Sequence, residues 1–316
     1  MERRSVVLSD GGRHHDMRTL LVTGASGFLG QHVHRAAVER GFDVVGLDRA
    51  GPRPVDLLNL ADVRKLVDEA KPDVVLHLAS VTNQRDLRSL FEVNVTGTAV
   101  LCEALSDSAA SLVVVGSSSV YGKTGDGLVS ETTPAAPRSL YAVSKWSQEQ
   151  VSLRSARVSG RTVTIARLFN LIGPGMPASL LAGTMAEQLA RAEAGGSKTL
   201  RFGTLTSTRD FLDVRDAANA LLGLAAAAPG GLFNVCSGVG VRVSRCLDVL
   251  RAASQTPIEV ATDEARSRPD DIPVQVGDPA AIQRALGWQP AISFEQSLRD
   301  LLETWRERVR HERTAG

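Results

Sequence analysis

The chain has few cysteines, almost no net charge and no long apolar run, and each shortage argues against a class of protein. Its 3 cysteines form no CxxC pair and leave one unpaired, which argues against a disulfide framework and favours a reducing compartment, here the cytoplasm. Its 36 basic and 35 acidic side chains nearly cancel, so no net field attracts nucleic acid or an anionic membrane. No apolar stretch approaches the roughly 18 residues of a membrane-spanning helix. We therefore expect a small-molecule partner, with no nucleic acid and no membrane.

The length and the apolar content set the size of the core. A chain of 316 residues with 43% apolar side chains can form one large domain or two that pack closely together. Residues 1–16 contain arginines but no apolar segment ahead of a cleavage site, so we interpret them as a flexible tail, with Met17 as a second candidate start.

Apolar runs alternate with segments of helical periodicity over the first half of the chain. The runs typical of buried strands are residues 19–24, 42–48, 73–80, 111–119 and 161–169. The helical segments between them are residues 28–40, 59–71, 89–107 and 141–157. Parallel strands need such crossovers, which cover both faces of their sheet. The pattern therefore predicts an α/β fold with a Rossmann-like doubly wound parallel sheet.

The pattern is less regular after about residue 174. Helical periodicity returns near residues 184–194, residues 200–211 look like a hairpin, and the alanine run 225–228 marks a helix end. The sequence has no linker, repeat or low-complexity tract. We therefore expect a smaller second α/β part that packs against the first.

A glycine-rich turn follows the first predicted strand, where "TGASGFLG" places Gly24, Gly27 and Gly30 before a helix. Glycines there let the backbone approach a pyrophosphate, whose charge the free N–H groups of the helix N-terminus favour. The spacing departs from GxGxxG, and a plain strand-to-helix turn is the alternative. Asp48 ends the next strand 24 residues after Gly24, where an acid meets ribose hydroxyls. Together these features predict a dinucleotide site.

Three residues bear on which dinucleotide binds. Asp48 would repel a 2′-phosphate, which favours NAD. Arg49 can turn outward and tolerate NADP, which is therefore not excluded. Asp56 is equally suited to bond the adenine or to serve as an acid at the start of the next helix.

Tyr141 and Lys145 stand one turn apart at the start of a predicted helix, so both side chains share a face. A lysine beside a phenol lowers the pKa of the tyrosine and makes it a usable general acid or base, and Lys145 can also bond the nicotinamide ribose. An ordinary amphipathic helix is the alternative for this pair alone. Residues 117–119 are serines that end a strand of the same sheet, outside whose carboxyl ends ligands bind. A hydroxyl there can polarise the carbonyl that the tyrosine protonates.

Eight stretches of the sequence, taken in order, resemble the extended short-chain dehydrogenase/reductases that act on nucleotide sugars. They are "TGASGFLG", "HLAS", "NVTGT", "GSSSVYG", "YAVSK", "RLFNLIGPG", "RDFLDVRDAANA" and "FNVCSG". The resemblance implies an NAD(P)-binding Rossmann domain at residues 17–175 and a mainly substrate-binding domain at residues 176–316, some of whose segments return to the first. It also implies a homodimer formed by the helices at residues 89–106 and 141–157.

The same resemblance implies roles by position, with Ser117, Tyr141 and Lys145 as the catalytic residues. The positions that it implies for the cofactor are Gly24, Gly27, Phe28, Leu29, Gly30, Asp48, Arg49, Asp56, Leu57, Ala79, Asn94 and Lys145. The positions that it implies for a nucleoside diphosphate sugar are Ser118, Asn170, Arg209 and Arg268. A guanidinium fork suits diphosphate oxygens, and the alternative for each arginine is a surface salt bridge with Asp210 or Asp270.

The two positions after Ser117 separate the reactions of this family. Its 4,6-dehydratases carry one or two acids there, whereas this chain has Ser118 and Ser119. A hydroxyl of ordinary pKa cannot replace a carboxylate in eliminating water, so a dehydratase is disfavoured and we interpret both serines as caps of a strand end. The C-terminal half resembles the GDP-4-keto-6-deoxymannose reductase branch, which implies NAD(P)H-dependent reduction of the 4-keto group of a nucleoside diphosphate 4-keto-6-deoxyhexose in deoxysugar biosynthesis.

Three other functions stay open. One is a nucleotide-sugar 4-epimerase with tightly bound NAD, and another is a ketoreductase whose substrate has no nucleotide. The third is a non-catalytic NAD(P)-sensing protein, against which the intact Ser–Tyr–Lys set argues. The sequence leaves open the nucleotide base, the configuration at C4 and the choice between NADH and NADPH.

The histidines do not form a metal site. His77 ends a buried strand, where we expect hydrogen-bonded partners rather than a ligand role. His32 and His34 are two residues apart on a helix and do not share a face. Trp288 is interpreted as a packing residue before the last helix.

Overall fold

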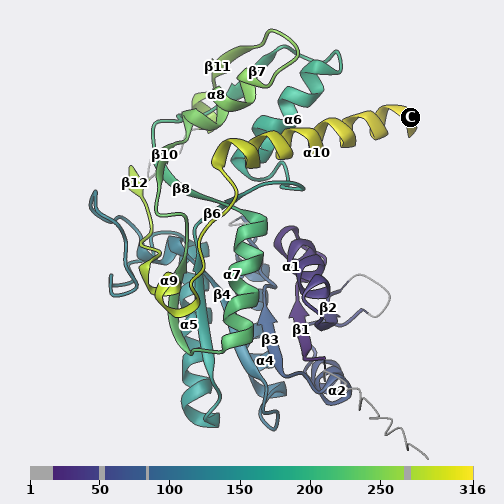
Figure 1. Ribbon diagram of the computed structural model, residues 1–316, viewed down its shortest axis with the longest axis vertical. Helices are drawn as coiled ribbons and strands as arrows, with labels where there is room; N and C mark the ends of the chain where they lie inside the picture. Colours follow the sequence, from purple (N-terminus) through teal and green to yellow (C-terminus); the bar gives the residue numbers. More distant parts are fainter. Residues whose placement is uncertain (1–16, 50–53, 83–84, 267–271, 316) are drawn as a thin grey trace, which may run out of the picture.

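The structure is a computed structural model that describes residues 17–49, 54–82, 85–266 and 272–315. A large sheet flanked by helices forms one end of the molecule, and a second group of helices and short strands forms the other (Figure 1). The predicted tail at residues 1–16 and the predicted substrate residue Arg268 lie outside the described residues.

The large sheet has six parallel strands in the order β2-β1-β3-β4-β5-β9. These strands are β1 (Thr19–Thr23), β2 (Asp43–Leu47), β3 (Val74–His77), β4 (Ser111–Ser117), β5 (Val163–Leu168) and β9 (Gly231–Val235). From β1 the chain passes to β2 on one side and afterwards to β3 on the other, and ligands of such sheets bind at this switch point, outside the carboxyl ends of the strands. The predicted doubly wound parallel sheet is confirmed.

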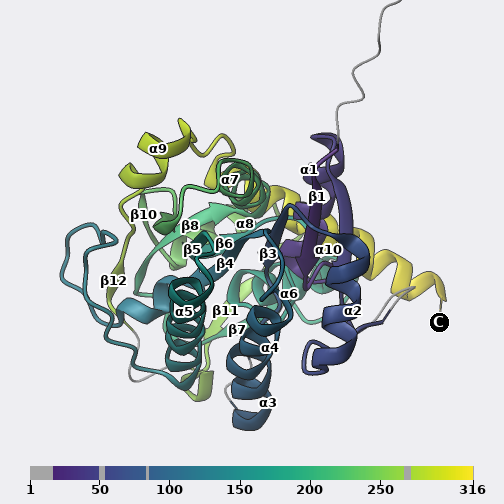
Figure 2. The same cartoon turned by 90° about the horizontal axis from the view of Figure 1, so that it is seen from below.

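Helices cover both faces of this sheet (Figure 2). One face carries α1 (Phe28–Glu39), α7 (Val214–Ala227) and α9 (Ala280–Leu286), and the other carries α2 (Leu60–Ala70), α4 (Gly97–Ala104) and α5 (Leu140–Ser159). Alternate residues of β1 serve both faces, because Leu20 packs with the first group and Leu21 with the second. Burial on both faces explains why the strands read as continuous apolar runs.

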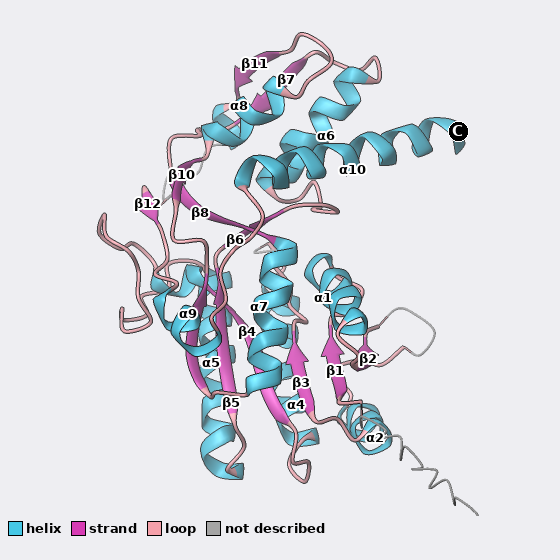
Figure 3. Cartoon of the chain, viewed as in Figure 1, coloured by secondary structure: helices cyan, strands magenta, loops and turns pink. Residues whose placement is uncertain are grey.

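The second half of the chain has its own core and smaller sheets (Figure 3). Its helices are α6 (Leu181–Glu193), α8 (Ser244–Ala252) and α10 (Phe294–Ala315), with a short 3₁₀ turn at Glu264–Arg266. One small sheet contains β6 (Asn170–Ile172), β8 (Thr208–Asp213), β10 (Gly240–Arg242) and β12 (Val274–Gln275), and β7 (Thr199–Phe202) pairs with β11 (Glu259–Thr262). In the part of the chain that the structure describes, none of the helices has the length and apolar content to cross a bilayer.

One prediction about secondary structure needs correction. The hairpin expected at residues 200–211 is wrong, because β7 pairs in parallel with β11 while β8 pairs with β6, β10 and β12. The helix expected at residues 89–107 is present as a continuous helical segment of α3 (Leu87–Phe91), a π-helical turn (Glu92–Thr96) and α4. The predicted helix end at residues 225–228 is confirmed, since Ala228 adopts the left-handed conformation after α7.

Candidate active site

The turn between β1 and α1 is packed so closely that it needs glycine. Gly24 has φ +72°, and a Cβ there would lie 2.9 Å from the backbone nitrogen of Ala79. A Cβ on Gly30 would lie 2.2 Å from the carbonyl oxygen of Gly24. Gly27 is the N-cap of α1 and supplies no side-chain cap, so the N–H groups that open α1 are free to bind an anion. These features fit the pyrophosphate of a dinucleotide.

Asp48, directly after β2, faces this turn. Its Oδ2 accepts a hydrogen bond of 2.9 Å from the backbone N–H of Ser26, while Arg49 beside it is exposed. Asp56 accepts from the N–H of Leu58 at 3.0 Å, and the N-cap of α2 is Asn59, so Asp56 is not the helix cap. The structure therefore brings Asp48 to the glycine turn and gives Asp56 a local turn contact.

The other predicted cofactor residues have mixed surroundings. Leu57 is buried against Gly97, where a Cβ would lie 2.8 Å from its Cδ2, so its side chain belongs to the core. Leu29 packs into the core between the large sheet and the helices α1, α7 and α9, whereas Phe28 packs against the core of the second half. Ala79 lies against the glycine turn, and its N–H donates to Thr23 Oγ1 at 3.1 Å.

Asn94 holds the β3–α3 loop against α5. Its Oδ1 accepts from the N–H of Val81 at 2.8 Å, and its Nδ2 donates to the carbonyl of Val81 and to Ser144 Oγ. Asn94 lies in a π-helical turn, and such turns often occur at functional sites.

The three serines at the end of β4 have three different roles. Ser117 is the N-cap of a 3₁₀ turn (Ser118–Tyr121), and its Oγ accepts from the N–H of Ser119 at 3.2 Å and from the Ser119 hydroxyl at 2.9 Å. Ser118 is buried and donates to Gln275 Oε1 at 3.2 Å. The cap is thus Ser117 itself, and Ser118, predicted to contact substrate, is turned toward β12.

Tyr141 lies in the first turn of α5, which Ser139 caps. The side chains of Ser117 and Ser80 lie close enough to its hydroxyl to act on its pKa. Burial raises the pKa of Tyr141 above its ordinary value, and the two serine hydroxyls act in the opposite direction. The predicted Ser117–Tyr141 pair is therefore in contact, whereas Lys145, expected to lower this pKa, is not among the groups that shift it.

Lys145 is buried, and its ammonium donates to the carbonyl of Val115 at 2.6 Å and to Gln148 Oε1 at 2.5 Å. Burial lowers the pKa of Lys145 to about 8, although the charge of Glu149 raises it. Glu149 also forms a buried ion pair of 2.6 Å with Arg167. The ammonium is thus held inside the protein one helical turn from Tyr141.

Ser80 is the site residue that the sequence reasoning missed. It stands after β3 in "HLAS", so its hydroxyl lies at the same edge of the sheet as Ser117, and this position was the available signal. Its Oγ donates to Asn94 Oδ1 at 3.1 Å and contacts the Tyr141 hydroxyl. Tyr141 is therefore held from two strands of the sheet.

The other two substrate candidates that the structure describes, Asn170 and Arg209, lie together in the small sheet. Asn170 of β6 donates from Nδ2 to the carbonyl of Asp210 at 3.0 Å, and Arg209 of β8 donates to the carbonyl of Thr208. The Asp210 carboxylate is buried and accepts from Ser237 and from the N–H groups of Gly238 and Gly277. Asp210 thus joins three segments of the second half.

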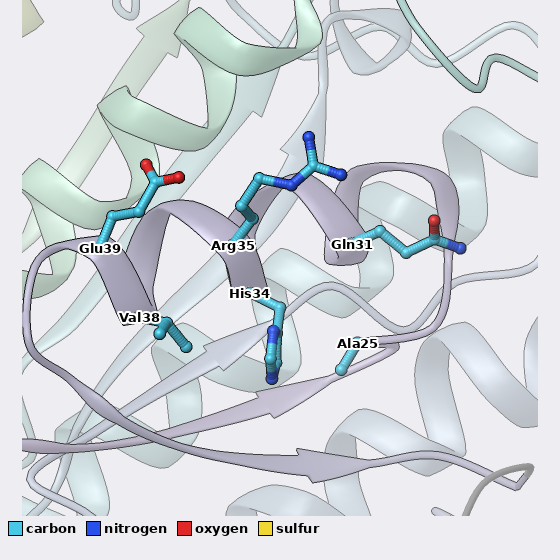
Figure 4. Close-up of a pocket in the computed structure, with 6 residues that line it drawn as sticks. All are labelled: Ala25, Gln31, His34, Arg35, Val38 and Glu39. Carbon is cyan, nitrogen blue, oxygen red and sulfur yellow. The ribbon is translucent and has the colours of Figure 1, made fainter. Parts of the chain in front are cut away.

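His77 and Trp288 have the expected surroundings. His77 is buried between the hydroxyls of Thr23 and Thr98, and Trp288 packs against the core that includes α7. No cluster of three or more candidate metal ligands occurs among the residues that the structure describes. A surface hollow along α1, shown in Figure 4, is lined by Ala25, Gln31, His34, Arg35, Val38 and Glu39. It contains none of the residues around Tyr141.

Comparison with known proteins gives a consistent result. A profile of the NAD dependent epimerase/dehydratase family matches residues 20–236. The GDP-6-deoxy-D-mannose reductase of Pseudomonas aeruginosa is 34% identical over 305 residues, which are 93% of this chain and 99% of that protein. The GDP-6-deoxy-D-talose 4-dehydrogenase of Aggregatibacter actinomycetemcomitans is 30% identical over 276 residues, 85% of this chain and 91% of that protein. The structure of RMD from Pseudomonas aeruginosa complexed with NADPH superimposes with a TM-score of 0.85 at 32% identity, over 92% of this chain and 100% of that one.

Proposed function

The chain belongs to the NAD dependent epimerase/dehydratase family and is an NAD(P)-dependent oxidoreductase, and we propose that it reduces the 4-keto group of a nucleoside diphosphate 4-keto-6-deoxyhexose. The observation that carries the proposal is the contact of the Tyr141 hydroxyl with Ser117, at the carboxyl edge of the sheet, in a chain with serines at both following positions. The similarity to two enzymes named for 6-deoxyhexoses linked to GDP supports it.

The residues of this chain supply a proton and hold the ketone. When bound, the reduced nicotinamide supplies the hydride that the C4 carbon takes up. Tyr141 donates its proton to the oxygen at C4, and its raised pKa keeps the phenol protonated at neutral pH. Ser117 bonds the same oxygen and polarises the carbonyl. Lys145 would hold the ribose of the cofactor through its ammonium.

The two positions after Ser117 carry no carboxylate for dehydration. Elimination of water from a 4-keto sugar needs an acid and a base beside the ring, and carboxylates usually provide both. Here Ser118 is bonded to Gln275 and Ser119 to Ser117. Reduction, which needs one hydride and one proton, requires neither acid.

The nucleotide of the substrate would be held by the second half of the chain. We assign its diphosphate to Arg209, Asn170 and Arg268, since guanidinium groups suit phosphate oxygens. A boundary near residue 175 then separates a cofactor domain from a mainly substrate-binding domain.

For the cofactor we favour NADH, because the Asp48 carboxylate beside the glycine turn would repel a 2′-phosphate, although a similar protein has been solved with NADPH.

The proposal is tested by following the absorbance of NADH and NADPH with GDP- and dTDP-linked 4-keto-6-deoxysugars. We expect oxidation with one pairing of cofactor and sugar, and Tyr141→Phe should lower kcat at least 100-fold with cofactor binding intact, because the proton donor is removed. Near-normal turnover by Tyr141→Phe would contradict the assignment. Copurified NAD without net oxidation would identify a 4-epimerase instead.

We also propose a cytoplasmic homodimer. The three cysteines, Cys102, Cys236 and Cys246, are free and buried, which suits a reducing compartment. Leu87, Trp146 and Val158 are 50%, 39% and 71% exposed on α3 and α5, and such apolar surface suits contact with a second copy.

A further inference from the structure

A chain of buried hydrogen bonds leads from Lys145 to the end of β1. Lys145 Nζ lies 2.5 Å from Gln148 Oε1, and Gln148 Nε2 lies 3.0 Å from Thr98 Oγ1. Thr98 Oγ1 lies 2.8 Å from His77 Nε2, and His77 Nδ1 lies 2.6 Å from Thr23 Oγ1. All five side chains are at most 2% exposed. A buried polar group without a partner costs free energy, and each of these five side chains has a hydrogen-bond partner inside the protein.

The direction of the bonds at Gln148 follows from elementary chemistry. An ammonium has no lone pair, so the oxygen of the Gln148 amide must face Lys145. The amide nitrogen then donates to Thr98, whose own hydroxyl proton is used on the carbonyl of Asn94 at 2.8 Å. Thr98 is therefore an acceptor toward both of its other neighbours.

The direction continues through His77. Because Thr98 can only accept, His77 carries its proton on Nε2, and its bare Nδ1 accepts from the Thr23 hydroxyl. Burial and the charge of Lys145 lower the pKa of His77 to about 3, so the ring stays neutral. Thr23 in turn accepts from the N–H of Ala79, beside the glycine turn. One tautomer thus fixes every bond in the chain.

We propose that Gln148 is a positioning residue for Lys145, with its amide oriented by Thr98 and His77. Val115 and Gln148 accept two of the three ammonium N–H bonds, and no further hydrogen-bond acceptor for Lys145 occurs among the described residues. The nitrogen of an ammonium is tetrahedral, so the two N–H groups bonded to Val115 and Gln148 determine the direction of the third. The protein thus fixes where the third N–H of Lys145 points. The inference rests on the proposed function for the role of Lys145, but the position of the ammonium can be measured without any sugar.

The test uses the small number of lysines. The chain has 5 lysines, so selective ¹³Cε labelling gives few signals, and Lys145→Arg identifies the one of interest. In Gln148→Leu the ammonium loses an acceptor, so the pKa of Lys145 should fall below the value of about 8. In Gln148→Glu a carboxylate faces it, so the pKa should rise. The other titratable groups around Lys145, namely Glu149, His77 and Tyr141, are unchanged in these variants.

Two further variants separate positioning from packing. Thr98→Val removes the acceptor that orients the Gln148 amide and should lower the pKa of Lys145, while Thr98→Ser keeps the hydroxyl and should leave it unchanged. The dissociation constant for NADH or NADPH, measured by fluorescence without sugar, should rise about tenfold in Gln148→Leu and Thr98→Val, as for one lost hydrogen bond. Gln255→Leu, the same change at an exposed turn, is the control.

The outcomes are distinct. An unchanged Lys145 titration in Gln148→Leu overturns the proposal, and so does an equal loss in Thr98→Val and Thr98→Ser, since that would show a packing role. If Gln148→Leu fails to fold, the two Thr98 variants decide alone. If no 4-keto sugar is reduced but the Lys145 shifts appear, the proposed substrate is wrong and the positioning role stands.

Discussion

The Tyr141 hydroxyl lies near two serine hydroxyls, that of Ser117 at the end of β4 and that of Ser80 after β3. A hydroxyl that donates to the phenol oxygen favours the phenolate and so lowers the pKa that burial has raised. Ser80 is itself bonded to Asn94, so its oxygen is fixed relative to α5. The acidity of the proton donor is therefore set jointly by these two serines and by the depth of the ring in the protein.

Ser80→Ala should raise the pKa of Tyr141, because it removes a hydroxyl that can turn its proton from Asn94 to the phenolate. Reduction needs the protonated phenol, so the alkaline limb of the pH profile of kcat should move to higher pH. At pH 7 kcat should fall about threefold to tenfold, since the phenol is less well held. Ser80→Thr, which keeps a hydroxyl, is the control. An alkaline limb at the same pH in Ser80→Ala would show that Ser80 does not act on Tyr141.

At the scale of the elements, α5 is joined to β5 by a buried ion pair. Arg167 Nη2 lies 2.6 Å from Glu149 Oε2, with side chains 7% and 1% exposed, and the Arg167 guanidinium lies over the Tyr121 ring at 4.6 Å. Gly116 of β4 makes room for the pair, because a Cβ there would lie 2.6 Å from Glu149 Oε1. The ion pair thus fixes the helix that carries Tyr141 and Lys145 over the sheet.

Arg167→Met should lower the free energy of unfolding by about 3–5 kcal/mol, because it leaves a buried carboxylate unpaired. Arg167→Met combined with Glu149→Leu removes both charges and should recover much of that loss. Chemical denaturation of Arg167→Met, Glu149→Leu and the double variant measures these values. A double variant as unstable as the sum of the two single changes would argue against this account.

An element could be predicted from the sequence when the pattern that identifies it lies within a few neighbouring residues. The glycine turn at Gly24 and the strands around it were predictable, since periodicity and turn chemistry are encoded within a few residues. The hairpin at residues 200–211 was wrong because the partners of β7 and β8 include strands far along the chain, which no local pattern identifies. The Asn94 side chain bonds the backbone of Val81, and Gln148 bonds Thr98, and these contacts between distant residues needed the structure.

At the scale of the whole molecule, the two halves are interleaved. After β6 and β8 the chain returns to supply α7 and β9 to the large sheet, and α9 also packs on that sheet. Asp210 and Asp216 bond backbone N–H groups near the crossings, at Gly238, Gly277 and Ile292. The proposed cofactor and substrate parts are therefore joined by several crossings of the chain.

The proposed homodimer predicts a mass of twice 33.6 kDa in solution. Trp146→Glu places a charge on the exposed apolar face of α5 and should shift the protein toward monomer. Val260→Glu, at a valine 41% exposed on β11, is the matched control and should stay dimeric. Light scattering after size exclusion measures both. A wild-type protein of 33.6 kDa at micromolar concentration would contradict the dimer.

β9 is translated well after β5, its neighbour in the large sheet, and this delay affects folding during synthesis on the ribosome. β5 ends at Leu168 and its outer partner β9 begins at Gly231, so roughly 60 residues must be translated before that edge of the sheet can pair. At about 5–20 residues per second, this interval lasts about 3–12 s. During that time the nascent chain presents an unpaired apolar strand, the kind of edge that chaperones bind and that aggregates when they are scarce.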